Sequence, residues 1–117
     1  MRIERNFVDG HFIEPASATL IAVQDPATET VVGQVSAATA AEAIAAVEAA
    51  AVAQKTWGKL TSIQRGDHLR AFADALEARA VPIGEALAAE SGKSLEDASN
   101  EARYAAQITR YHAEWAR

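Results

Sequence analysis

Apolar residues alternate with polar ones in short runs through the first third of the chain and recur every three to four residues in the remainder. A period of two is typical of β-strands, and a spacing of three to four is typical of amphipathic helices. The pattern therefore predicts an α+β fold, with short antiparallel β-ribbons over residues 1–36 and about four α-helices over residues 37–117.

Two turn signals divide the first third into strands. Asp9-Gly10 readily takes the positive φ values of a type I′ hairpin turn. In the segment Asp25–Thr28, Pro26 pre-sets φ for a turn, and the Asp25 carboxylate can accept a hydrogen bond from the backbone two residues on. The strands predicted around these turns are Phe7-Val8, His11–Ile13, Thr19–Val23 and Thr30–Val35. Because the runs are short, we expect small ribbons and no large sheet.

The first helix is predicted from a capping box, Thr39-Ala40-Ala41-Glu42, and should run to about Gln54. The stripe that we expect to face the core consists of Ile44, Val47 and Ala51. Glu42 and Glu48 should then face outward.

The second helix starts at a similar pattern, Thr61-Ser62-Ile63-Gln64, and should end near Arg79. Its apolar stripe consists of Leu69, Phe72, Leu76 and Ala80. The third helix is short, since Pro82 suits a first turn and Gly92 is a natural C-cap. Its apolar edge consists of Ile83 and Leu87.

The fourth helix is predicted after Ser94, which can serve as N-cap, with Glu96 and Asp97 in the first turn, where the helix dipole favours acids. Its large apolar residues are Tyr104, Ile108, Tyr111 and Trp115. We interpret this stripe as a packing face in preference to a stacking platform for a ring-shaped ligand. No glycine, asparagine or proline stop signal follows it before Arg117.

Composition and charge narrow the function classes. Half of the residues are hydrophobic, but many are alanine, so the core must depend on a few large side chains. A net charge of −5 with no Lys/Arg cluster argues against a nucleic-acid partner. Glu42, Glu48 and Gln54 interrupt the longest apolar runs, so we expect no membrane span. The N-terminus lacks the apolar region of a secretory signal, and we expect a cytoplasmic location.

The candidate sites all have simpler structural explanations. Gly92-Lys93-Ser94 resembles the end of a phosphate-binding P-loop, but Leu87 stands where that motif requires a glycine, so we interpret these residues as a C-cap followed by an N-cap. His11, His68 and His112 lack metal-ligand spacing. The serines fit caps or turns, and none lies in a G-x-S-x-G elbow. The acidic pairs Glu96 with Asp97 and Glu85 with Glu90 are typical of solvated helix faces. We therefore assign no catalytic, cofactor-binding or metal-ligating residue in this chain.

Several local strings, in this order, resemble the N-terminal segment of the aldehyde dehydrogenase superfamily. They are Phe7–Phe12, the turn Asp25–Glu29, the alanine-rich helix Glu42–Gln54 with Trp57 after it, Gln64-Arg65 leading into Leu69-Arg70, Glu90–Lys93, and Tyr111–Ala116. The resemblance covers essentially the whole chain. Its last residues are similar to the branch that includes lactaldehyde and glycolaldehyde dehydrogenases.

This resemblance implies an enzyme that oxidises an aldehyde to a carboxylic acid with NAD or NADP. In the family a cysteine thiolate attacks the aldehyde, hydride passes to the nicotinamide, and a glutamate activates the water that hydrolyses the thioester. The family's catalytic cysteine and glutamate, its oxyanion-hole asparagine and its dinucleotide-binding turn lie downstream of the segment that this chain resembles. The chain itself contains no cysteine.

We therefore expect residues 1–117 to be the incomplete N-terminal part of an aldehyde dehydrogenase domain, at the periphery of its cofactor-binding domain. The fragment should be inactive and bind no cofactor alone, although the parent enzyme uses NAD or NADP. Its expected partners are the remainder of the polypeptide and further copies in a homo-oligomer, with the stripe on the fourth helix facing the missing part. The alternative is a non-catalytic, self-associating helical module derived from that family. The aldehyde and the choice of nucleotide stay open.

Overall fold

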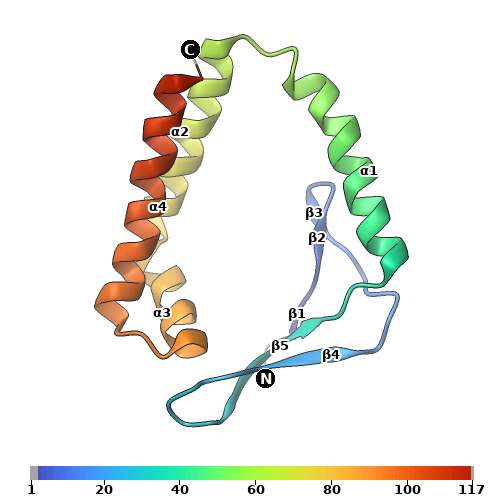
Figure 1. Ribbon diagram of the computed structural model, residues 1–117, viewed down its shortest axis with the longest axis vertical. Coiled ribbons are helices and arrows are strands. Elements are labelled where there is room, and N and C mark those ends of the chain that lie inside the picture. The colour runs from blue at the N-terminus through green and yellow to red at the C-terminus, as the bar shows by residue number, and fades with distance from the viewer. Residues whose placement is uncertain (1–2, 117) are drawn as a thin grey trace. The chain divides into compact units, whose positions relative to one another are not determined.

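The computed structural model describes residues 3–116, and the chain divides into two compact units, Met1–Gly58 and Lys59–Arg117 (Figure 1). In chain order the elements are β1 (Ile3–Glu4), β2 (Phe7–Val8), β3 (His11–Phe12), β4 (Leu20–Gln24), β5 (Val31–Ser36), α1 (Ala40–Trp57), α2 (Ser62–Ala78), α3 (Ala80–Ser91) and α4 (Leu95–Trp115). The first unit holds the strands and α1, and the second holds the other helices. The predicted α+β class, with strands first and helices after, is confirmed.

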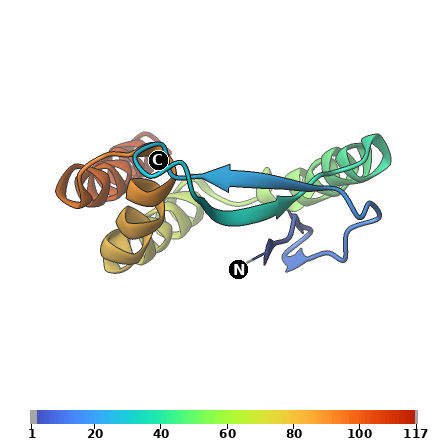
Figure 2. The same cartoon turned by 90° about the horizontal axis from the view of Figure 1, so that it is seen from below.

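Two small sheets form the strand part of the first unit (Figure 2). β2 and β3 make an antiparallel hairpin, and its turn residues Asp9 and Gly10 have φ values of 51° and 81°, the positive values expected there. β4 pairs antiparallel with β5, with an irregularity in register between Val23 and Gln24. β1, which the sequence pattern did not predict, pairs in parallel with the other edge of β5. The expectation of purely antiparallel pairing is wrong at this edge, because a two-residue strand shows no recognisable alternation.

The predicted capping box opens α1. The Thr39 hydroxyl accepts a hydrogen bond from the Glu42 backbone N–H at 3.2 Å, and the Glu42 carboxylate accepts one from the Thr39 N–H at 2.7 Å. The other carboxylate oxygen of Glu42 accepts from the backbone N–H of Ala16 at 2.9 Å. These bonds to Thr39 and Ala16 lower the pKa of Glu42 below its ordinary value.

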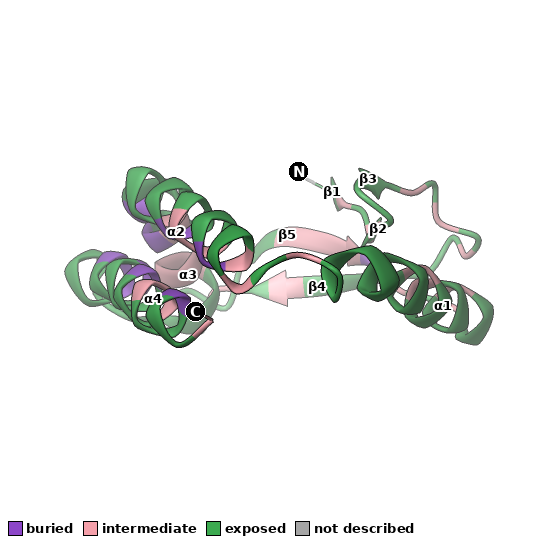
Figure 3. Cartoon of the chain, turned by 90° about the horizontal axis from the view of Figure 1, so that it is seen from above, coloured by how far each residue is buried: buried purple, intermediate pink, exposed green. Residues whose placement is uncertain are grey.

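The rotation of α1 differs from the prediction. Ile44 and Val47 are 60% and 70% exposed, while Glu42 is half-buried. Figure 3 shows most of α1 coloured as exposed. Alanines turn toward the β2–β3 hairpin instead, and Ala46 and Ala49 line grooves there together with hairpin residues. The predicted core stripe of α1 is therefore wrong within this chain, because the hydrogen bond from the N-terminal segment draws the Glu42 side of the helix inward.

In the second unit α4 packs along both α2 and α3 (Figure 1). Alanine dominates the interface. The buried apolar residues of this unit are Ala73, Ala80, Ala98, Ala102, Ala106 and Ala113. Two glycines allow especially close approach. A Cβ on Gly84 would lie 2.3 Å from the Ser99 hydroxyl oxygen, and one on Gly66 would lie 3.0 Å from the Ala113 carbonyl oxygen. The helices therefore meet through their smallest side chains.

The stripe predicted on the second helix is only partly an internal face. Ala80 is buried at the start of α3, and Leu69 and Leu76 are half-buried. Phe72, its largest member, is 57% exposed. The fully buried position on α2 is instead Ala73, at 0% exposure, because the helices of this unit approach each other through small side chains.

Two arginines connect α2 to α4 at the rim of this interface. Arg70 donates to Asp67 at 2.6 Å and to Glu114 at 2.9 Å. Arg110 donates to Asp74 at 2.7 Å and to Glu77 at 2.5 Å. Hydrogen bonding to Asp67 and to Asp74 raises the pKa of Arg70 and of Arg110, respectively. The helix pair is thus closed by small residues inside and ion pairs outside.

Candidate functional site: an apolar docking face

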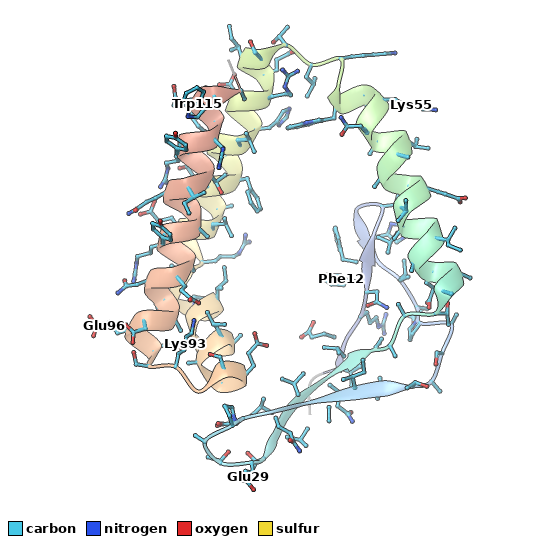
Figure 4. All side chains as sticks on the ribbon, viewed as in Figure 1. Phe12, Glu29, Lys55, Lys93, Glu96 and Trp115 are labelled. Atoms are coloured by element: carbon cyan, nitrogen blue, oxygen red, sulfur yellow. The ribbon has the colours of Figure 1, made fainter. Side chains whose placement is uncertain are left out.

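The large side chains of α4 lie on the face opposite its buried alanines. Trp115, at the C-terminal end of this helix, is labelled in Figure 4. We call this surface the α4 aromatic face; it consists of Tyr104, Ile108, Tyr111 and Trp115, which are 62%, 41%, 59% and 72% exposed. Residues at these spacings share one side of a helix. The rings of Tyr111 and Trp115 meet edge to face, with centroids 6.0 Å apart. The predicted stripe exists, and no described residue of the second unit covers it.

Throughout the described chain the buried apolar residues are small, and many large ones are exposed. Every buried apolar residue is an alanine, and no large side chain among residues 3–116 is fully buried. Large apolar residues are instead exposed on α1 and α2, for example Val47 at 70% and Ile63 at 62%. Extended apolar surface of this kind marks an interaction site in soluble proteins. These exposed apolar side chains are therefore candidates for contact with a further protein surface.

The segment Gly92-Lys93-Ser94 is a link between two helices. Gly92 has a φ of 72° and donates its backbone N–H to the Ala88 carbonyl at 2.9 Å, which ends α3. The Ser94 side chain accepts from the Asp97 backbone N–H at 3.1 Å and so caps α4. The Lys93 ammonium pairs with the Glu101 carboxylate. The interpretation as a C-cap followed by an N-cap is confirmed.

The histidines lie on three separate elements. The Nδ1 of His11 is 3.0 Å from the Asp9 carbonyl oxygen in the β2–β3 hairpin. His68 is on α2, and His112 on α4 packs edge-on against Tyr111, with centroids 5.4 Å apart. Among the described residues no cluster of three or more His, Cys, Asp or Glu side chains could hold a metal ion.

The acidic pairs noted in the sequence are not brought together into a site. Asp97 accepts a hydrogen bond from the Ser94 hydroxyl at 2.7 Å as part of the α4 cap. Glu96, Glu85 and Glu90 are on their helices, and none of them is buried. An open groove of about 470 Å³, which was not predicted from the sequence, runs along the first turns of α4 and is lined by Lys93, Asp97, Asn100, Glu101 and Tyr104. The signal in the sequence is that Lys93, just before α4, can reach Glu101 on its second turn and so enclose the residues between them.

The strand-to-helix connection among the described residues does not fit a dinucleotide site. Such a site needs a glycine-rich turn between a strand and a helix, where backbone N–H groups can approach the pyrophosphate. The direct strand-to-helix connection in the described residues runs from β5 to α1 through Ala37-Ala38-Thr39, which contains no glycine. We therefore assign no nucleotide chemistry to these residues.

None of the helices in the part of the chain that the structure describes combines the length and the apolar character that a bilayer crossing requires.

Comparison with known proteins identifies the segment. A profile described as the aldehyde dehydrogenase family matches residues 12–117. The α-ketoglutaric semialdehyde dehydrogenase of Bacillus subtilis is 36% identical over 109 residues, which are 92% of this chain and 22% of that protein. Lactaldehyde dehydrogenase of Escherichia coli is 34% identical over 111 residues, which are 95% of this chain and 23% of that protein.

Solved structures give the same result. The crystal structure of Escherichia coli lactaldehyde dehydrogenase matches 99% of this chain and 24% of its own, with a TM-score of 0.93 and 32% identity. A structure of 3,6-anhydro-L-galactose dehydrogenase in complex with NAP also has a TM-score of 0.93, at 29% identity, over 99% of this chain and 24% of its own. The chain thus spans about a quarter of the length of these relatives. Because the profile match runs through nearly all of the sequence, the chain belongs to the aldehyde dehydrogenase family.

Proposed function

We propose that residues 1–117 are the N-terminal segment of an NAD(P)-dependent aldehyde dehydrogenase, an oxidoreductase that converts an aldehyde into a carboxylic acid. In this proposal the segment is scaffold, and the rest of the polypeptide supplies the nucleophile and the nucleotide site. A cytoplasmic, homo-oligomeric parent enzyme belongs to the same proposal. Family membership supports it, as do relatives described as NADP-dependent or as bound to NAP.

The α4 aromatic face is the observation that carries the proposal. A surface helix of a globular protein has one apolar stripe, and a helix with apolar residues on opposite sides is an internal one. α4 buries Ala98, Ala102, Ala106 and Ala113 on one side and exposes Tyr104, Ile108, Tyr111 and Trp115 on the other. A further apolar layer on the exposed side would complete the packing of this helix.

Inactivity of the isolated segment follows from its composition. The family's covalent mechanism starts with a thiolate, because only the deprotonated sulfur is the nucleophile. The 117 residues contain no cysteine. The covalent step therefore requires a residue from outside this sequence.

The alternative is a non-catalytic module that associates through the same surface. In a two-fold dimer, the α4 aromatic face of one copy would pack against that of the second. Trp115 is 72% exposed, and either a second copy of the chain or the rest of the same polypeptide could cover it. The oligomeric state of the 117-residue chain separates the two proposals.

The test compares the 117-residue chain with the polypeptide encoded by the whole reading frame that contains it. Each is incubated with NAD⁺ or NADP⁺ and a panel of short aldehydes, and formation of the reduced nucleotide is followed. We expect the longer polypeptide to turn over the aldehyde and the 117-residue chain to show no turnover. Reproducible turnover by the 117-residue chain would refute the inactivity. A reading frame that ends at Arg117, with a stable dimer in sedimentation experiments, would favour the module.

A further inference from the structure

Helix α1 has two apolar sides of different character. One side, formed by Glu42, Ala46, Ala49 and Ala53, turns toward the N-terminal strands, and all four residues line grooves there. The opposite side consists of Ala40, Ile44, Val47 and Ala51, at the spacings of a continuous helical stripe. We call this second side the α1 valine face. Ile44 and Val47 on it are 60% and 70% exposed.

The rotation of α1 is fixed by hydrogen bonds, so the valine face cannot turn inward at low cost. Both carboxylate oxygens of Glu42 are engaged, one by the Ala16 N–H at 2.9 Å and the other by the Thr39 N–H and hydroxyl at 2.7 and 2.8 Å. Turning the helix by half a revolution would break the bond to Ala16 and move the carboxylate away from the N-terminal strands. The exposure of the valine face is therefore part of the fold of this unit.

The chemistry of the valine face indicates the kind of surface that covers it. α1 has 18 residues, and its charged residues are Glu42, Glu48 and Lys55. Glu42 is on the opposite side and Lys55 bounds the face at its C-terminal end. Glu48 shares its row with Val52, one turn later, on a flank of the helix. The valine face itself is uncharged and aliphatic, which suits an apolar protein surface.

We propose that the α1 valine face is a second docking surface, covered in the complete protein by the part of the polypeptide that lies outside residues 1–117. This inference rests on the proposed function. Two matched solved chains contain a segment of similar fold, with a TM-score of 0.93, and this segment makes up only 24% of their length. The fold that exposes the valine face here thus occurs in chains with about three times as much additional polypeptide available to cover it.

Two valines on α1 provide a matched test. Val47 is on the valine face and Val52 is on the Glu48 flank, about 140° away around the helix at 100° per residue. In this chain their exposures are similar, 70% and 65%. Val47→Cys and Val52→Cys are each made in the polypeptide encoded by the whole reading frame, and alkylation of each introduced thiol is followed by peptide mass spectrometry. The denatured protein gives the reference rate.

We expect the thiol of Val47→Cys to react at least tenfold more slowly than that of Val52→Cys in the folded protein. Equal rates would overturn the proposal. Protection that disappears on dilution would overturn it too, because it would identify a second copy as the cover. A reading frame that ends at Arg117 would also overturn the proposal, because no further polypeptide would then exist to cover the face.

The readout keeps this proposal separate from the proposed function, because alkylation does not depend on turnover. A polypeptide that oxidises aldehydes but labels equally at both positions would refute the docking surface alone. One that shows the tenfold protection but oxidises no aldehyde would refute the proposed activity alone. A harsher pair, Val47→Asp and Val52→Asp, adds a stability readout, and the aspartate at position 47 should lower the Tm of the polypeptide more.

Discussion

Replacing Gly84 by alanine should force α3 away from α4. An added Cβ would lie 2.3 Å from the Ser99 hydroxyl oxygen, 2.7 Å from its backbone nitrogen and 2.8 Å from its α-carbon. Rotation of the serine side chain relieves only the first clash, because the other two atoms are in the backbone. Ordinary van der Waals separation begins at 3.4 Å, so the helices must move apart by roughly 0.6 Å before the new methyl group clears the α-carbon of Ser99.

The expected cost has two opposing parts. Overpacking a tight interface costs about 1–3 kcal/mol, and two backbone clashes place this site at the upper end. Alanine is favoured over glycine in a helix interior by about 1 kcal/mol. The net destabilisation should therefore be about 2 kcal/mol, which lowers the Tm by roughly 8–16 °C if the compact unit Lys59–Arg117 unfolds on its own.

Urea and thermal unfolding of the 117-residue chain, followed by circular dichroism, measure this effect. Ala86→Gly is the matched control, since Ala86 is exposed on the same helix and reports helix propensity alone, a loss of about 1 kcal/mol. Adding Ser99→Gly to Gly84→Ala should restore only part of the stability, because the backbone clashes persist. If Gly84→Ala unfolds at or above the wild-type midpoint, the close approach of α3 and α4 is wrong.

Three further predictions concern hydrogen bonds and charges. Glu42→Gln should destabilise the chain at neutral pH and much less in acid. Bonds from Thr39 and Ala16 lower the pKa of Glu42, so its contribution to stability is complete above the ordinary carboxyl pKa and is lost as the pH falls through the lowered pKa. A pH-independent difference in urea unfolding would contradict this. Arg110→Gln should lower the Tm slightly in low salt and less in high salt, because salt screens the exposed ion pairs between Arg110 and the α2 carboxylates. A change in Tm that does not depend on salt would show that these ion pairs are not its cause. Ser94→Ala should cost about 1 kcal/mol in urea unfolding and Ser94→Gly only a few tenths, whereas equal losses would show that capping of α4 is not the cause.

Short-range signals predicted the elements well. The capping boxes at Thr39 and Thr61, the N-cap Ser94 and the C-cap Gly92 all occur where the sequence indicated. So does the Asp9-Gly10 turn. Each of these depends on a hydrogen bond or a φ preference within about four residues, so the local sequence contains all the partners that decide it.

The candidate docking surface could be predicted only in part. The spacing of Tyr104, Ile108, Tyr111 and Trp115 defines the α4 aromatic face from sequence alone. Its exposure depends on α2 and α3 packing against the alanine side of the helix. On α1 the same reasoning gave the wrong inward face, because the deciding bond joins Glu42 to Ala16, 26 residues away.

The sequence by itself determined the helices, their caps, the hairpin turn and the family, since propensities, turn chemistry and recognisable strings are local properties. Only the tertiary structure decided which apolar face of each helix is covered. Burial energy depends on apolar area and has no direction, so a helix with both an alanine side and a large-residue side can pack on either. The partners within these residues approach closely through alanine and glycine, and they leave the larger side chains of α1 and α4 outward.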